Sequence, residues 1–315
     1  MRDGLKLSLV ALGVLLVAGY FLGHGLTADN YAYFLSRRTP KVLAIALAAI
    51  AISASSLVFQ TITNNRILTP SILGFDSLYV LLQTTLLVAF GSTSALLVNP
   101  YLNFAVSVLL MAVMASVLFT LYFRRHRANI YTLLLIGIVL GSVFGSISQF
   151  FTLLVDPSEF AVLQDAMFAS FNNANRDLVY ISVPVLALCL LALYRYANQL
   201  DVCLLGEDNA TSLGIDTRGL TLKVMMIIAV MIAVSTALVG PVLFFGLIVV
   251  SLARQMFVSF QHRFLILATS VLAVFLLLTG QYVVEQWFGF ETTVSVIINF
   301  VGGSYFLYLL TKNKF

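Results

Sequence analysis

The chain holds few side chains that could do acid–base, metal or nucleophilic chemistry, and they are scattered. Its three histidines, His24, His126 and His262, are far apart, and none falls within a long apolar run. The two cysteines, Cys189 and Cys203, do not form a paired metal or redox motif. A phosphate-binding Gly-x-x-x-x-Gly-Lys-[Ser/Thr] loop, a Gly-x-Ser-x-Gly elbow and a His-Glu-x-x-His pair are all absent from the sequence. The sequence therefore predicts no catalytic residue, no metal site and no cofactor in this chain, which we expect not to be an enzyme.

Asp76 is the one carboxylate well inside an apolar run. An ion-gradient-driven secondary transporter needs such a group near the membrane midplane, together with broken helices in both halves of the chain. Asp76 lies near one end of its run, where a helix-end or packing residue is more usual. Only Asp76 and a break at Gly240-Pro241 favour a secondary transporter, which we keep as the alternative function. A membrane-embedded enzyme has less support, because no titratable groups converge.

The elements that carry these residues belong in lipid. Of the 315 residues, 61% are hydrophobic and 10% are charged, whereas soluble domains have roughly 25% charged residues. Runs long enough to cross a bilayer must be helical, because backbone groups in lipid bond internally. The sequence predicts an all-α polytopic membrane protein with a single transmembrane domain over residues 1–315 and about ten helices: Leu5–Leu22, Val42–Ile62, Leu68–Phe90, Tyr101–Phe123, Ile130–Leu154, Leu178–Ala197, Leu220–Val239, Pro241–Val258, Phe264–Val283 and Val294–Leu310. The eighth run, opened by Gly240-Pro241, is expected to be a broken or short helix.

Positive charge predicts the orientation of these helices. Lysine and arginine are enriched on the cytoplasmic side of membrane proteins. Ten crossings from a cytoplasmic N-terminus place thirteen of these cations inside, namely Arg2, Lys6, Arg66, Arg124, Arg125, Arg127, Arg195, Arg218, Lys223, Arg254, Arg263, Lys312 and Lys314. Only four, Arg37, Arg38, Lys41 and Arg176, then lie outside. Both termini are therefore predicted to be cytoplasmic.

One polar segment, Asn198–Gly219, is much longer than a connection between two spans requires. It is predicted to form two short helices separated by a turn. Gly206 and Gly214 suit a turn or a helix stop, and Asn209–Ser212 offers capping residues. It is either a long solvated loop or a cytoplasmic surface for a partner.

Three cations, Arg37, Arg38 and Lys41, lie on the predicted outer side just before the second run, against the charge rule. They either reach toward lipid headgroups at the membrane surface or form a docking surface for an acidic external partner.

Four blocks of residues, spaced from Arg38 to Leu310, form an ordered set of motifs. The first is Arg38-x-Pro40-Lys41-Val42-Leu43-Ala44, followed by Gln60 and by Asn65-Arg66-Ile67-Leu68-Thr69-Pro70-Ser71-Ile72-Leu73-Gly74. The others are Leu205-Gly206-Glu207-x-x-Ala210-x-x-Leu213-Gly214-Ile215, then Gly240-Pro241-Val242-Leu243-Phe244-Phe245-Gly246-Leu247-Ile248 with Ala253-Arg254, and finally Glu291, Gly302 and Phe306–Leu310. In order and spacing these blocks resemble the permease subunits of bacterial ABC importers for iron–siderophores, haem and cobalamin.

The chain departs from that pattern at several positions. Lys41 stands in place of arginine and Arg66 in place of proline, and Glu285 falls about where many members carry an outer arginine. Small or helix-breaking residues are also exchanged at Ala49, Ser56, Val250-Ser251, Thr293, Ser295 and Ser304. These exchanges suggest local changes of helix geometry within one fold.

The resemblance implies a permease in the bacterial inner membrane that translocates a ferric siderophore. Its implied partners are a second permease subunit (the same or a different chain), two ATPase subunits that bind ATP and Mg, and a periplasmic substrate-binding protein. It assigns ATPase coupling to Gly206, Glu207, Ala210, Leu213 and Gly214, with Ala210 and Leu213 as a small apolar face. It assigns binding-protein docking to Arg38 and Lys41. Gln60, Asn65, Pro70 and Gly74 are expected mainly to shape a turn, and no residue is assigned to the cargo path.

Overall fold

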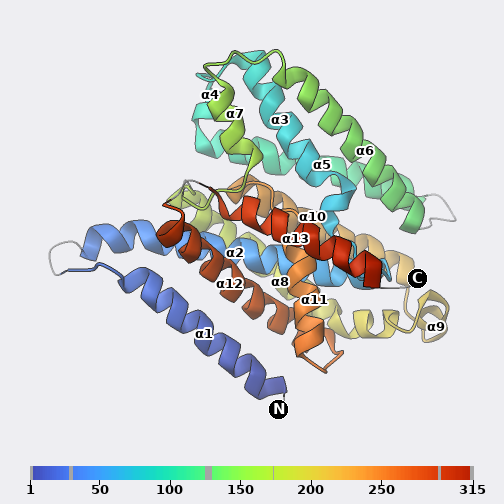
Figure 1. Cartoon of the computed structure of the whole chain (residues 1–315). Helices are drawn as coiled ribbons and strands as arrows, with labels where there is room; N and C mark the ends of the chain where they lie inside the picture. Colours follow the sequence, from blue (N-terminus) through green and yellow to red (C-terminus); the bar gives the residue numbers. More distant parts are fainter. Residues whose placement is uncertain (1–2, 28–30, 125–129, 173, 290–291, 313–315) are drawn as a thin grey trace.

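The computed structural model describes residues 3–27, 31–124, 130–172, 174–289 and 292–312 (Figure 1). Within these ranges there is no strand, and one helix overlaps each of the ten predicted runs: α1 (Asp3–Gly23), α2 (Tyr31–Ile62), α3 (Phe75–Phe90), α5 (Pro100–Arg124), α6 (Ile130–Thr152), α8 (Arg176–Cys203), α10 (Thr217–Val239), α11 (Phe245–Met256), α12 (His262–Trp287) and α13 (Val294–Lys312). Four short helical segments connect them: η1 (Pro70–Leu73), α4 (Ala95–Val98), α7 (Phe160–Met167) and α9 (Glu207–Ser212). The all-α prediction is confirmed.

Seven of these helices are long and apolar enough to cross a membrane, judged over the described residues. They are α1, α2, α5, α6, α8, α10 and α12, while α3, α11 and the apolar part of α13 (Val294–Tyr308) are shorter.

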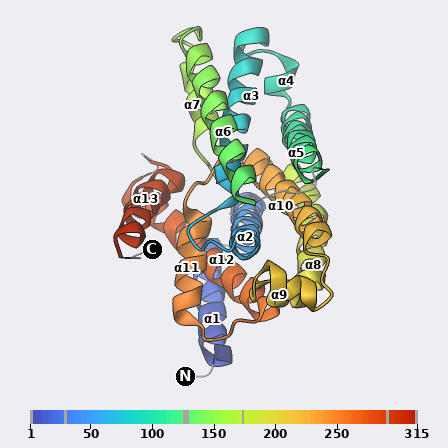
Figure 2. The same ribbon diagram turned by 90° about the vertical axis from the view of Figure 1, so that its right-hand side faces the viewer.

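The central element is α2, and α8, α10, α11 and α12 pack around it (Figures 1 and 2). Its buried face is rich in small residues such as Ala44, Ala48, Ala51 and Ser55, which allow helix axes to approach closely in lipid. Ser56 lies directly against Gly246 of α11, where a Cβ atom would have no room. The serine at position 56 is therefore accommodated by a glycine on the neighbouring helix.

The third run is not one helix, contrary to the prediction. It forms η1, turns at Gly74 with φ 84°, and only then enters α3. Pro70 begins the short helix, and the left-handed conformation at position 74 favours glycine. A Cβ atom on Gly74 would lie 3.0 Å from the Cα atom of Gly141 in α6. The bend thus lets α3 and α6 pack backbone to backbone.

The eighth run is short, as expected. Gly240 has φ 91°, and regular helix begins only at Phe245. The 12 residues of α11 rise about 18 Å, well under the ~30 Å of a bilayer core. This helix therefore crosses only part of the thickness that the longer helices span.

Contacts between distant segments define two ends of the helix bundle. At the end predicted to be cytoplasmic, which we call the inner end, the Asp3 carboxylate accepts hydrogen bonds from the backbone N–H groups of Val258 and Ser259 at 3.0 and 2.8 Å. At the opposite, outer end, the N–H of Ser170 donates to the carbonyl of Val239 at 2.8 Å. The grouping agrees with alternate crossings, while the assignment of either end to the cytoplasm stays a prediction from charge. Arg2, Arg125, Arg127, Lys314 and Glu291 lie outside the described residues.

Candidate functional site

The polar segment at the inner end contains one short helix, so the prediction of two is wrong. Helix α8 continues to Cys203, because Ala197 and Leu200 keep it packed in the core beyond the apolar run. The side chain of Asp216 caps α10 by accepting from the N–H of Gly219 at 3.0 Å. Only α9 stands between these two long helices, and Figure 2 shows it at the edge of the molecule below α8 and α10.

Two glycines bound α9, as the sequence predicted. Gly206 has φ 94° and Gly214 has φ 84°, conformations that favour glycine. The carbonyl of Gly206 accepts from the N–H of Ala210 at 3.0 Å, and the carbonyl of Ala210 accepts from the N–H of Ile215 at 3.1 Å. The predicted capping hydroxyls lie inside the helix instead, where Thr211 and Ser212 donate to carbonyls four residues earlier.

The exposed apolar surface of this segment differs from the predicted one. Ala210 is fully buried, so the prediction that it faces a partner together with Leu213 is wrong. Leu213 is 64% exposed and Leu205 is 58% exposed, on either side of α9. The accessible surface of this element thus includes these two leucines and the acidic residues Glu207 and Asp208, together with polar side chains of α9.

The buried side chain of His262 connects the end of α8, just before α9, to α2 in the core. The Nδ1 atom of His262 lies 2.6 Å from the Asp201 carboxylate, and its Nε2 atom lies 2.7 Å from the Thr61 hydroxyl. The backbone N–H of His262 also donates to Asp201, at 2.7 Å. Because the three residues belong to α12, α8 and α2, a displacement of the end of α8 acts directly on both other helices.

The outer cations are already engaged within the chain. The Arg38 guanidinium donates to the carbonyl of Leu22 at 3.3 Å and lies over the ring of Phe34, 4.8 Å from its centroid. Lys41 forms a salt bridge with Glu285, and both side chains are only about one-seventh exposed, at 15% and 14%. Glu285 therefore neutralises a cation of its own chain. Docking through Arg38 and Lys41 stays a prediction.

The signature turn after α2 is formed by three of its four predicted residues. The Asn65 side chain accepts from the N–H of Ile67 at 3.0 Å, Pro70 begins η1 and Gly74 supplies the bend. Gln60 differs from these three, because both polar atoms of its buried amide lack a hydrogen-bond partner among the described residues.

Asp76 lies in the first turn of α3 and is almost fully buried. Ser71 and Thr236 lie beside it along the wall of one small cavity, and its Oδ2 atom has no hydrogen-bond partner among the described residues. A carboxylate in a first helical turn is favoured by the helix dipole. This environment is that of a helix-end residue, the interpretation that the sequence favoured.

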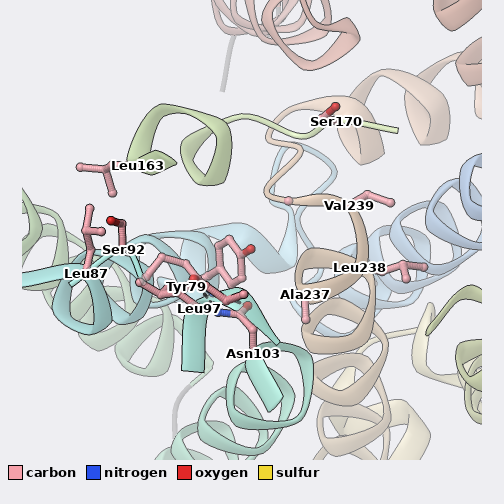
Figure 3. A pocket seen from close by; sticks show the side chains of 13 residues that line it. Tyr79, Leu87, Ser92, Leu97, Asn103, Leu163, Ser170, Ala237, Leu238 and Val239 are labelled. Atoms are coloured by element: carbon pink, nitrogen blue, oxygen red, sulfur yellow. Dashed lines mark hydrogen bonds between the residues drawn. The ribbon is translucent and has the colours of Figure 1, made fainter. Parts of the chain in front are cut away.

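An outer pocket of about 460 Å³ lies between α3, α5, α10 and the short helix α7, and sequence reasoning did not find it (Figure 3). None of its lining residues is charged. The amides of Gln83 and Asn103 donate to each other at 3.0 Å, and each makes one more hydrogen bond, to Ser107 and to the carbonyl of Leu96 respectively. A glutamine and an asparagine within apolar runs were the sequence signal for this pocket.

Three comparisons relate the chain to known proteins. The FecCD transport family matches residues 6–312. The petrobactin import system permease protein YclO of Bacillus subtilis is 46% identical over 100% of this chain and 99% of its own length. The corresponding permease FatC of Bacillus anthracis is 30% identical over 98% of this chain and 88% of its own length.

A solved structure has the same fold. It is an inward-facing conformation of a putative metal-chelate type ABC transporter, and it covers 98% of both chains with a TM-score of 0.83 at 22% identity. These findings confirm the resemblance drawn from the four sequence blocks. The chain belongs to the FecCD transport family and is a multi-pass membrane permease of the ABC-importer class.

Proposed function

We propose that this chain is the permease subunit of an ATP-driven importer for a ferric siderophore of the petrobactin class, located in the bacterial cytoplasmic membrane. The observation that carries this proposal is the 46% identity to a petrobactin permease over the whole chain. A second relative, FatC, is also named for petrobactin import, and its 30% identity supports the same class of chelate.

The proposed importer needs further chains, because this sequence lacks a phosphate-binding loop. Two ATPase subunits would bind ATP and Mg, a second permease subunit would complete the path, and an external binding protein would deliver the chelate. Helix α9 with Leu205 and Leu213 is the proposed contact for the ATPase, because it is short, bounded by two glycine turns and exposed. The Asp201–His262–Thr61 contacts would pass its displacement to α2 and α12.

The test is transport by the complete complex reconstituted in liposomes. Iron-55 supplied as ferric petrobactin with the binding protein should enter only when ATP reaches the ATPase subunits. A complex whose ATPase subunits lack the lysine of their phosphate-binding loop is the control, and it should be inactive. Uptake driven by an imposed proton or sodium gradient without ATP would instead identify the secondary transporter. Uptake of other ferric chelates but not of ferric petrobactin would refute the cargo and keep the mechanism.

A further inference from the structure

A second pocket, of about 350 Å³, lies at the inner end of the molecule, beside Thr61 and His262, and the proposed transport cycle assigns no ligand to it. We call it the inner pocket. It is bounded by the turn after α2, the end of α11 and the loop from α11 to α12. Leu204, which lies just before α9, also lines it.

Two arginines, Arg66 and Arg254, line the inner pocket without an acidic partner. In the part of the chain that the structure describes, the two salt bridges are Lys41–Glu285 and His262–Asp201, so neither arginine is paired with a carboxylate. The Nε atom of Arg254 is buried without a hydrogen-bond partner there. Both side chains line the same pocket, so their like charges repel each other. Like charges held together in this way are stabilised when an anion binds between them.

Two carboxylates contact residues that line the inner pocket, and both bind other groups. Asp3 accepts two backbone hydrogen bonds, from Val258 and Ser259, and Asp201 accepts from both the ring and the backbone of His262. Neither acid forms a salt bridge with Arg66 or Arg254 among the described residues.

A third side chain indicates a missing polar ligand. Gln60 lines the same pocket and is only 2% exposed, yet neither its amide nitrogen nor its amide oxygen has a partner among the described residues. A buried amide without hydrogen bonds costs roughly 1–3 kcal/mol, so such groups are rare in folded proteins unless a ligand or water completes them.

The geometry points to a phosphate-type oxyanion as the ligand, and we propose that the inner pocket binds one between Arg66 and Arg254, with the amide of Gln60 as a further donor. Guanidinium groups bind phosphate through paired N–H bonds. The rim is apolar and exposed, with Val258 at 86% and Phe260 at 70%. This rim would accept an acyl chain, and basic pockets at the cytoplasmic ends of membrane helices bind phospholipid headgroups. The ligand is either such a headgroup or a soluble phosphate ester.

The proposal is tested on the whole transporter, purified with its partner chains, by native mass spectrometry. Phosphatidylglycerol, phosphatidylcholine and glycerol phosphate are offered separately. The wild type should retain phosphatidylglycerol in preference to phosphatidylcholine, and added salt should weaken the binding. Arg66→Gln and Arg254→Gln should each weaken retention roughly tenfold, because each removes a charge-assisted hydrogen-bonding group. Arg263→Gln is the matched control, since Arg263 is also predicted to be inside but lies over the ring of Tyr194.

Competition by glycerol phosphate would identify the headgroup alone as sufficient, and binding of the lipid only would identify the membrane as the source. Either result supports the site. Equal retention of both lipids by the wild type, together with no binding of glycerol phosphate, refutes the proposal without recourse to a variant. Unchanged retention in the double arginine variant also refutes it. If the intact transporter binds no phosphate compound and binds one only after the ATPase chains are removed, the arginines serve carboxylates of a partner, and the proposal is wrong.

Discussion

The outer and inner pockets differ in how their polar groups are satisfied. At the outer pocket, Gln83 and Asn103 use all four of their amide N–H groups within the chain, and no lining residue is charged. At the inner pocket, Gln60 and the Nε atom of Arg254 have no partner among the described residues. The outer cation Lys41 likewise has Glu285, whereas Leu213 at the inner end lies exposed. The polar groups of the outer pocket are thus satisfied within the chain, whereas those of the inner pocket are left for contact with something else.

The largest effect is expected at Leu213, the exposed leucine that follows α9 in the proposed contact with the ATPase. Leu213→Asp should leave the protein inserted in the membrane but reduce uptake of the proposed siderophore at least about 30-fold, corresponding to about 2 kcal/mol for loss of an interface anchor. ATP hydrolysis by the partner subunits should continue. Uptake and ATPase rates are measured in the same liposomes.

Thr211→Asp is the control for Leu213→Asp, because Thr211 is exposed on the same short helix and is not part of the apolar surface. Normal uptake by Leu213→Asp would refute the proposal that Leu213 contacts the ATPase. The exposure of Leu213 would then no longer indicate a partner at the inner end.

Two buried glutamines test the contrast directly. Gln83→Met should lower the free energy of unfolding by roughly 1–3 kcal/mol, because it leaves Asn103 and Ser107 without their partner. Gln60→Met should be neutral or stabilising in protein freed of lipid, because it removes an amide that has no hydrogen bond. Thermal unfolding in detergent measures both. Equal losses at the two positions would show that the ends do not differ in this respect.

The outer salt bridge should be worth less than the amide pair. Lys41→Met and Glu285→Gln should each destabilise the protein by about 1 kcal/mol, because the pair is partly exposed and one charge is left behind. The exchanged pair, Lys41→Glu with Glu285→Lys, should recover part of that loss. A double-mutant cycle gives the coupling energy, and a value of zero would mean that Lys41 is available to an external partner after all.

The smallest effect is expected at Arg38. Arg38→Glu should slow association of the binding protein a few-fold at low salt and hardly at all at high salt, because rim charges act mainly on the rate of encounter. Arg176→Glu is the charge-matched control on another predicted outer segment. Equal slowing by both variants would assign the effect to net charge rather than to a docking contact at Arg38.

The length and apolar character of the runs were sufficient to predict the fold class and the approximate positions of ten helices. The breaks within runs were harder to predict. The short eighth helix was expected from Gly240-Pro241. Gly74 was expected to shape the turn after the second run, but the break that it makes within the third run was not predicted, because its contact with Gly141 joins residues that are distant in the sequence.

Some features of the candidate site were predicted and others were not, again because the sequence indicates local backbone features but not tertiary contacts. The turns at Gly206 and Gly214 are local backbone features, and glycine alone indicates them. Whether Ala210 faces outward depends on how α9 packs against α8 and α10, and this orientation is not encoded in the spacing of the motif. Likewise, no local pattern could pair Lys41 with Glu285 or bring Arg66 beside Arg254.

The continuity of α2 has a practical consequence. Between Lys41 and Thr61 the helix is unbroken and rises about 30 Å, the thickness of the hydrocarbon core. Because α2 is a continuous helix, tilting its outer end also moves its inner end. An antibody fragment that binds only the outer end of α2 is therefore expected to change the spacing between Thr61 and His262 at the inner end and to inhibit the protein from a distance.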